Sequence, residues 1–130
     1  MPRRRSRPLA IEPEAFETLV RQAIDGVPSE YRRLLKNIAI VVEDTPSRDV
    51  LDELGLESED ELLGLYSGTS LLEGESFFSV GGQLPSRISI YRKPILRLCR
   101  SAEEVVNEVR DTVVHEIGHH FGLDDDEMPY

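Results

Sequence analysis

Apolar residues recur with helical spacing near the start of the chain. The positions three or four apart predict a helix that begins at Pro13 and ends before Gly26 and Pro28; they are Phe16, Leu19, Val20, Ala23 and Ile24. We expect this helix to back one face of a sheet. Residues 31–36 predict a short helix or a connection.

Four later segments have the pattern of strands. Residues 37–43 are continuously apolar and β-branched, which predicts a strand buried on both faces. Residues 62–68 predict a second strand, 76–80 a short third strand, and 87–92 a strand with clean alternation. Ser47 is placed to cap a short helix that runs through Leu54 and ends at Gly55. Residues 95–99 predict a connecting turn or short helix.

The last periodic segment predicts a longer helix. Ser101 and Glu104 have the spacing of a capping box. Its apolar side carries Val105, Val106, Val109, Val113, Val114, Ile117 and Phe121. The opposite side carries Glu108, Asp111, Thr112, His115 and His119, with Glu116 between the two sides. The whole pattern predicts an α+β fold in which a small, mixed, twisted sheet has a backing helix and this C-terminal helix.

Composition narrows the class of protein. The 130 residues suffice for one domain over 11–130, preceded by a disordered, basic tail over 1–10. A net charge of −10 argues against nucleic acid as a partner. No apolar signal segment or membrane-spanning run is visible, so no membrane association is expected. Cys99 is the single cysteine, which excludes an internal disulfide and suits a cytoplasmic location.

The chemistry is concentrated in residues 115–125, which read His-Glu-Ile-Gly-His-His-Phe-Gly-Leu-Asp-Asp. On a helix, His115 and His119 lie one above the other and present two imidazoles to one point. Glu116 is near enough to reach a water held there. His120 projects toward the apolar side, which favours packing or a hydrogen bond over metal binding.

A third ligand is expected just after the helix. Gly122 can end the helix in a left-handed turn and reverse the chain direction. Asp124 and Asp126 would then share one side of an extended segment, with Asp125 on the other. Two imidazoles and one carboxylate leave one tetrahedral position open, which is typical of catalytic zinc.

The motif H-E-x-x-H-x-x-G-x-x-D resembles that of zincin peptidases, in the metzincin-like branch where Asp replaces the usual third His, as in snapalysin. Together with residues 84–95, it is also similar to a family of small bacterial zincin-like proteins. The resemblance implies a Zn²⁺ site formed by His115, His119 and Asp125, and Glu116 as the general base of peptide-bond hydrolysis.

The resemblance also implies a peptide or protein substrate that pairs with an antiparallel edge strand above the motif helix. The segment expected to fill that role is Phe77, Phe78, Ser79 and Val80. Two other functions use the same residues. One is a metal-bound interaction or stability module without peptidase activity, and the other is an amide hydrolase acting on a small molecule.

Overall fold

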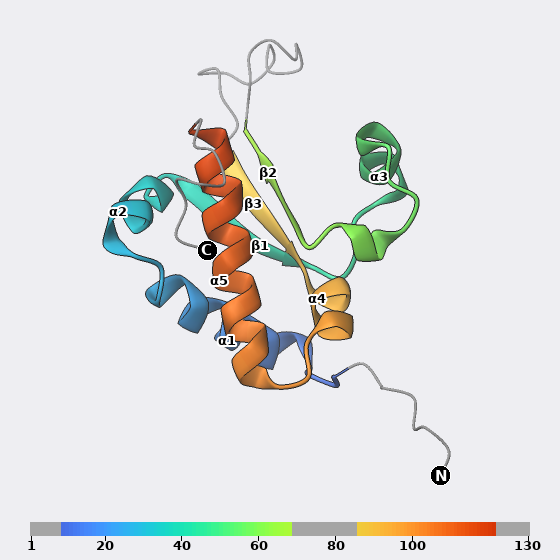
Figure 1. Ribbon diagram of the computed structural model, residues 1–130, viewed down its shortest axis with the longest axis horizontal. Coiled ribbons are helices and arrows are strands. Elements are labelled where there is room, and N and C mark those ends of the chain that lie inside the picture. The colour runs from blue at the N-terminus through green and yellow to red at the C-terminus, as the bar shows by residue number, and fades with distance from the viewer. Residues whose placement is uncertain (1–8, 69–85, 122–130) are drawn as a thin grey trace.

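A computed structural model describes residues 9–68 and 86–121 and places three strands in one mixed sheet. The strands are β1 (Ile38–Glu43), β2 (Gly64–Ser67) and β3 (Ser86–Tyr91), in the order β1-β3-β2. β3 is central, and it runs parallel to β1 and antiparallel to β2. Figure 1 shows α5 (Ala102–His120) crossing in front of this sheet, with α1 (Pro13–Asp25) beneath it.

The main core lies between the sheet and these two helices. Ile88 and Ile90 of β3 are fully buried on the face covered by α5. The apolar residues of α1 recur every three or four positions and therefore form one side of the helix, from which Phe16 enters the core. The other buried core residues of α1 and α5 are Val20, Ala23, Val105, Val109, Val113, Val114 and Ile117. Packing against α1 and the sheet therefore fixes the position and rotation of α5.

Shorter helices connect these elements. α2 (Ser29–Arg32) and η1 (Arg33–Leu35) lead into β1, α3 (Arg48–Leu54) follows it, and η2 (Glu59–Glu61) precedes β2. α4 (Arg92–Leu98) joins β3 to α5. Within residues 9–68 and 86–121, no helix has both the length and the apolar character needed to cross a membrane.

Local capping defines the ends of α3 and α5. The Ser47 hydroxyl accepts from the Val50 N–H at 3.1 Å, and Gly55 ends α3 with a φ of 73°. Ser101 caps α5 by accepting from the Glu104 N–H at 3.1 Å. The Glu104 carboxylate accepts from the Arg100 N–H instead of the Ser101 N–H expected in a capping box.

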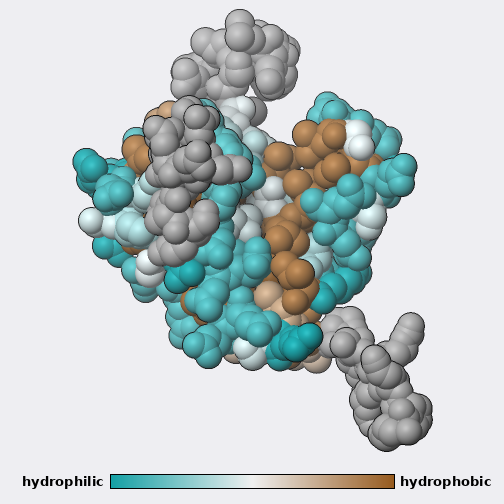
Figure 2. All heavy atoms as spheres, in the orientation of Figure 1, coloured by the Kyte–Doolittle hydropathy of each residue, from teal (hydrophilic) through white to brown (hydrophobic). Residues whose placement is uncertain are grey.

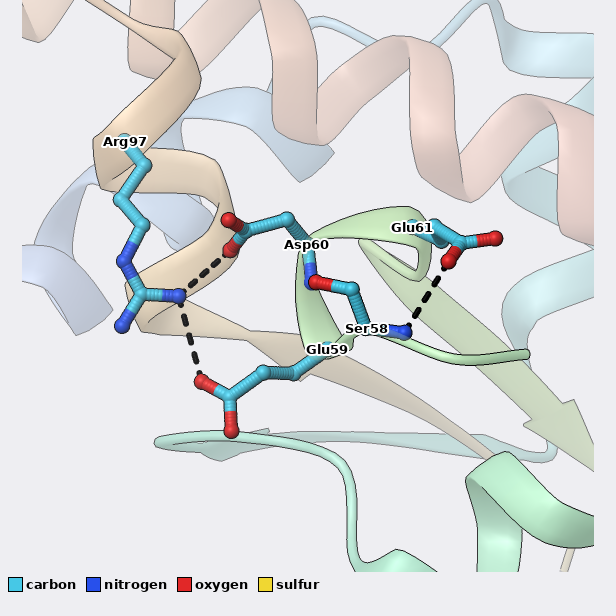
Figure 3. A network of polar contacts seen from close by, with 5 residues as sticks. All are labelled: Ser58, Glu59, Asp60, Glu61 and Arg97. Atoms are coloured by element: carbon cyan, nitrogen blue, oxygen red, sulfur yellow. Dashed lines mark hydrogen bonds and ion pairs between the residues drawn. The ribbon is translucent and has the colours of Figure 1, made fainter.

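Ion pairs with α4 hold η2 in place. Figure 3 shows Arg97 of α4 reaching both Glu59 and Asp60, while the Glu61 carboxylate accepts from the Ser58 N–H at 3.0 Å. Glu59, Asp60 and Glu61 therefore each have a partner. Because the Arg97 ion pairs are solvent-exposed, we expect them to contribute about 1 kcal/mol or less each.

The predicted α+β class is confirmed, and two details of burial are wrong. β1 was expected to be buried on both faces, but Ala39 is exposed and the other residues of the strand are half-buried. The reason is that β1 lies at the edge of the described sheet. Phe121 was expected on the apolar side of α5, but it is 50% exposed beyond the last turn. The strand predicted at 76–80 lies outside the described residues.

Candidate active site

α5 presents the two motif histidines on the side away from the main core. Val113, Val114 and Ile117 are fully buried, whereas His115 is half-buried and His119 is exposed. The imidazole centroids of His115 and His119 lie 6.0 Å apart. The residues at 115 and 119 are one helical turn apart, so both rings extend over one patch of the helix surface, as the sequence predicts.

A backbone contact orients the His115 ring. Its Nδ1 atom lies 3.1 Å from the backbone oxygen of Asp111, one turn earlier. A carbonyl oxygen can only accept a hydrogen bond, so Nδ1 must carry the proton. Nε2 is then the ring nitrogen that would bind a metal, and a hydrogen bond at the other nitrogen is a common way to orient a histidine ligand.

Glu116 lies between the helix and the sheet. Its Oε1 atom accepts from the backbone N–H of Tyr66 at 2.9 Å. Partial burial raises the pKa of the Glu116 carboxyl, and the Tyr66 N–H together with His119 and His115 acts in the opposite direction. Glu116 therefore combines a fixed carboxylate position with greater basicity than an exposed glutamate has, which suits a general base.

The register of β2 explains why Tyr66 can reach Glu116. The Tyr91 N–H donates to the Leu63 carbonyl at 2.9 Å, and pairing continues with Leu65 opposite Ser89. Because hydrogen-bonded and non-hydrogen-bonded pairs alternate in an antiparallel ladder, the backbone groups of Gly64 and Tyr66 point away from β3. β2 thus turns one backbone edge toward α5 and the motif.

A cavity of about 260 Å³ lies along this edge of β2. Leu62 and Leu63 give it apolar walls, and Figure 2 shows hydrophobic atoms gathered in the hollow between α5 and the lobe of α3 and η2. The polar residues and glycine that complete the lining are Glu61, Gly64, Glu108, Asp111, Thr112, His115 and Glu116. The cavity therefore adjoins both the motif and the outward edge of β2.

A larger cavity of about 640 Å³ lies elsewhere, between α1 and β1. It is lined by Val20, Ile24 and Val42 among others, and it contains neither motif histidine. The smaller cavity is the better candidate for an active site because His115 and Glu116 form part of its wall.

Two other titratable groups near α5, Cys99 and Glu108, also have raised pKa values. Burial raises the pKa of the Cys99 thiol to about 11, with Glu108 and Glu104 adding to the shift. A thiol with that pKa stays protonated near neutral pH, in agreement with the buried position of Cys99. Glu108, in the cavity wall, has a raised pKa because of burial and the nearby Asp111.

Only part of the predicted site falls within the described residues. Asp125 and the segment Phe77–Val80 lie outside them, so their placement stays a prediction. Among residues 9–68 and 86–121, no three His, Cys, Asp or Glu side chains form a group able to hold a metal ion. The structure thus brings together His115, His119 and Glu116 and leaves the third ligand to be tested.

Two residues near the motif make contacts whose partners the sequence did not indicate. His120 extends toward β2, where its Nε2 atom lies 3.1 Å from the Tyr66 hydroxyl. Packing or a hydrogen bond was expected for His120, and its exposed side chain makes this polar contact and also packs against the Tyr66 ring. Tyr66 was not singled out, because a tyrosine within an apolar strand carries no signal of a contact with residues 50 and 54 positions away.

Comparison with known proteins identifies the family of the chain. The zincin-like metallopeptidase family matches residues 35–130, and the chain belongs to that family. A solved structure described as a conserved hypothetical protein from Thermo thermophilus is 26% identical, with a TM-score of 0.49. That similarity covers 83% of this chain and 92% of the other. Among curated proteins, no sequence matches the chain.

Proposed function

We propose that the protein is a zinc-dependent peptidase. The observation that carries this proposal is the arrangement of His115, His119 and Glu116 beside a cavity, in a chain of the zincin-like metallopeptidase family. His115 and His119 would hold the metal through imidazole nitrogens. Asp125, which follows the helix in the motif, would be the third ligand.

The residues present fit zinc. The hydrogen bond at Nδ1 orients His115 so that Nε2 would be its ligating nitrogen, and two imidazoles with one carboxylate form a donor set typical of catalytic zinc sites. When bound, zinc supplies Lewis acidity that polarises a carbonyl and lowers the pKa of water.

Glu116 would perform the proton transfers. Its Oε1 atom is engaged by the Tyr66 N–H, which leaves Oε2 to take the proton from the attacking water. Glu116 would then pass this proton to the nitrogen of the leaving amine. Its raised pKa favours uptake of the proton in the first step.

Among the described strands, β2 is a candidate to dock the substrate along its outward edge, as an alternative to the expected segment Phe77–Val80. An extended peptide would pair with the backbone of Gly64 beside His115 and Glu116, by β-augmentation. Tyr66 donates its N–H to Glu116, so pairing would end at Tyr66 and bring the next substrate peptide group to the carboxylate. The cavity walls formed by Leu62 and Leu63 would accept an apolar side chain.

The test is peptide cleavage by the full chain loaded with one equivalent of zinc. A broad library of unstructured peptides should be cleaved, and cleavage should stop on addition of a chelator and return with zinc. Zinc binding without cleavage of any library member would contradict the peptidase proposal and favour a metal-bound interaction module. Cleavage of small amides but not peptides would favour the small-molecule hydrolase.

A further inference from the structure

Tyr66 connects the edge strand to the motif helix at two points. Its backbone N–H donates to Glu116 Oε1 at 2.9 Å, and its hydroxyl lies 3.1 Å from His120 Nε2. The hydroxyl also donates to the Ser86 Oγ atom of β3 at 3.0 Å. The Tyr66 and His120 rings are in contact, with centroids 4.0 Å apart. One residue therefore holds β2, β3 and α5 together beside the motif.

The helix is suited to this double contact. Glu116 and His120 are four residues apart, so they extend from the same side of α5 toward β2. Tyr66 meets them with its backbone and its side chain respectively. Gly68 leaves room for the ring, because a Cβ atom at that position would lie 2.8 Å from the Tyr66 hydroxyl oxygen.

We propose that Tyr66 is a positioning residue for Glu116, an inference that rests on the proposed peptidase function. A glutamate side chain has several rotatable bonds, and a general base must lie within hydrogen-bonding distance of the proton that it takes. The Tyr66 N–H fixes one carboxylate oxygen. The phenol, held by His120 and Ser86, keeps that N–H at a constant distance from α5.

This assignment gives His120 a role different from that of its neighbour His119. His119 shares its side of the helix with His115, whereas His120 contacts Tyr66 and supports Glu116 through it. Loss of His120 should therefore reduce turnover without removing zinc. Loss of His119 should remove zinc.

The first experiment is Tyr66→Phe, which deletes the hydroxyl but keeps the backbone N–H and the ring against His120. We expect kcat to fall about tenfold because two hydrogen bonds are lost. KM and zinc affinity should stay within about twofold of wild type, since neither docking nor metal ligation changes. Tyr31→Phe removes the hydroxyl of a second buried tyrosine, in α2, and serves as the control for the loss of a phenolic hydroxyl as such. A kcat for Tyr66→Phe equal to that of the control would overturn the proposal.

A second pair of variants isolates the N–H. Tyr66→Ala and Tyr66→Pro both lose the phenol, but only the proline variant loses the backbone donor. Proline is compatible with the sheet here because the N–H of residue 66 points away from β3. The proline variant should turn over at least about tenfold more slowly than the alanine variant, as expected for a lost hydrogen bond to a carboxylate. Equal rates in two folded variants would show that the N–H does not position Glu116.

Amide hydrogen exchange tests the contact without any turnover. In wild type the Tyr66 N–H should exchange slowly, and Glu116→Ala should accelerate its exchange about ten- to a hundredfold. Asn107→Ala, at an exposed position of the same helix, is the control and should leave that exchange rate unchanged. If wild type cleaves no peptide but the Tyr66 amide depends on Glu116 in this way, the peptidase proposal fails and the positioning contact stands. A Tyr66 amide that is insensitive to Glu116→Ala would overturn the positioning role whatever the activity.

Discussion

Gly64 of β2 and Thr112 of α5 approach so closely that a side chain on Gly64 has no space. A Cβ atom at Gly64 would lie 2.6 Å from Thr112 Cγ2 and 3.0 Å from the Ser89 carbonyl oxygen. The second of these neighbours is backbone and cannot rotate away. The separation between the edge strand and the motif helix is therefore set by the absence of a side chain at residue 64.

Gly64→Ala should destabilise the fold by about 1–3 kcal/mol, the usual effect of overpacking. Chemical denaturation monitored by circular dichroism measures the change. The control is Gly26→Ala, where the new Cβ meets only ordinary contacts at 3.6 Å and 3.8 Å. That variant should lie within about 1 kcal/mol of wild type. Equal stability of the two variants would mean that β2 and α5 separate at little cost.

Replacing Glu116 by Gln separates metal binding from proton transfer. The amide keeps an oxygen that can accept from the Tyr66 N–H but cannot take a proton from water. Turnover should fall at least about a hundredfold, the usual contribution of a general base. Zinc content, measured on the same preparation, should equal that of wild type. Loss of zinc from Glu116→Gln would show that Glu116 is a ligand.

The third zinc ligand can be identified by comparing three neighbouring aspartates. Asp125→Ala should weaken zinc binding by more than about a hundredfold, since the loss of groups that merely orient ligands already weakens affinity about 10–100-fold. Asp124→Ala and Asp126→Ala should bind zinc nearly as wild type does. Zinc titrations in one buffer decide the matter. If Asp124→Ala or Asp126→Ala binds zinc more weakly than Asp125→Ala does, the turn after Phe121 differs from the one predicted.

Glu108 should make stability depend on pH in a defined direction. Burial and the nearby Asp111 raise its pKa in the folded state above the ordinary value of 4.5. The folded state therefore binds more protons than the unfolded state, so the stabilising contribution is complete below pH 4.5 and is lost as the pH rises through the folded-state pKa.

It follows that Glu108→Gln should raise the free energy of unfolding of the zinc-free protein at neutral pH, with the difference vanishing in acid. Denaturation curves between about pH 4 and pH 8 measure the effect. Glu53→Gln changes an exposed glutamate of α3 and serves as the control. A variant that is stabilised equally at every pH would show that the titration of Glu108 is not the cause.

Elements defined by local signals could be predicted from the sequence. Ser47 and Gly55 bound α3 as expected because each acts on backbone groups within a few residues of itself. The side of α5 that carries His115 and His119 also followed from spacing alone. A period of 3.6 residues determines which side chains share a helix face, whatever the rest of the chain does.

Features that depend on distant partners could not be predicted in this way. An apolar β-branched strand such as β1 has the same pattern at the centre and at the edge of a sheet, so its half-buried state required the strand order. The contact between Tyr66 and Glu116 joins residues 50 positions apart and depends on the register of β2 against β3. A shift of one residue would exchange the outward and inward backbone groups.

Because Cys99 is buried, labelling of its thiol can be used to measure unfolding. The thiol is 6% exposed within the main core, and its pKa of about 11 leaves little thiolate at neutral pH. A thiol-specific reagent should therefore react slowly with the folded chain and quickly with the unfolded one. Because Cys99 is the single cysteine, each labelled molecule records one opening at the junction of α4 and α5.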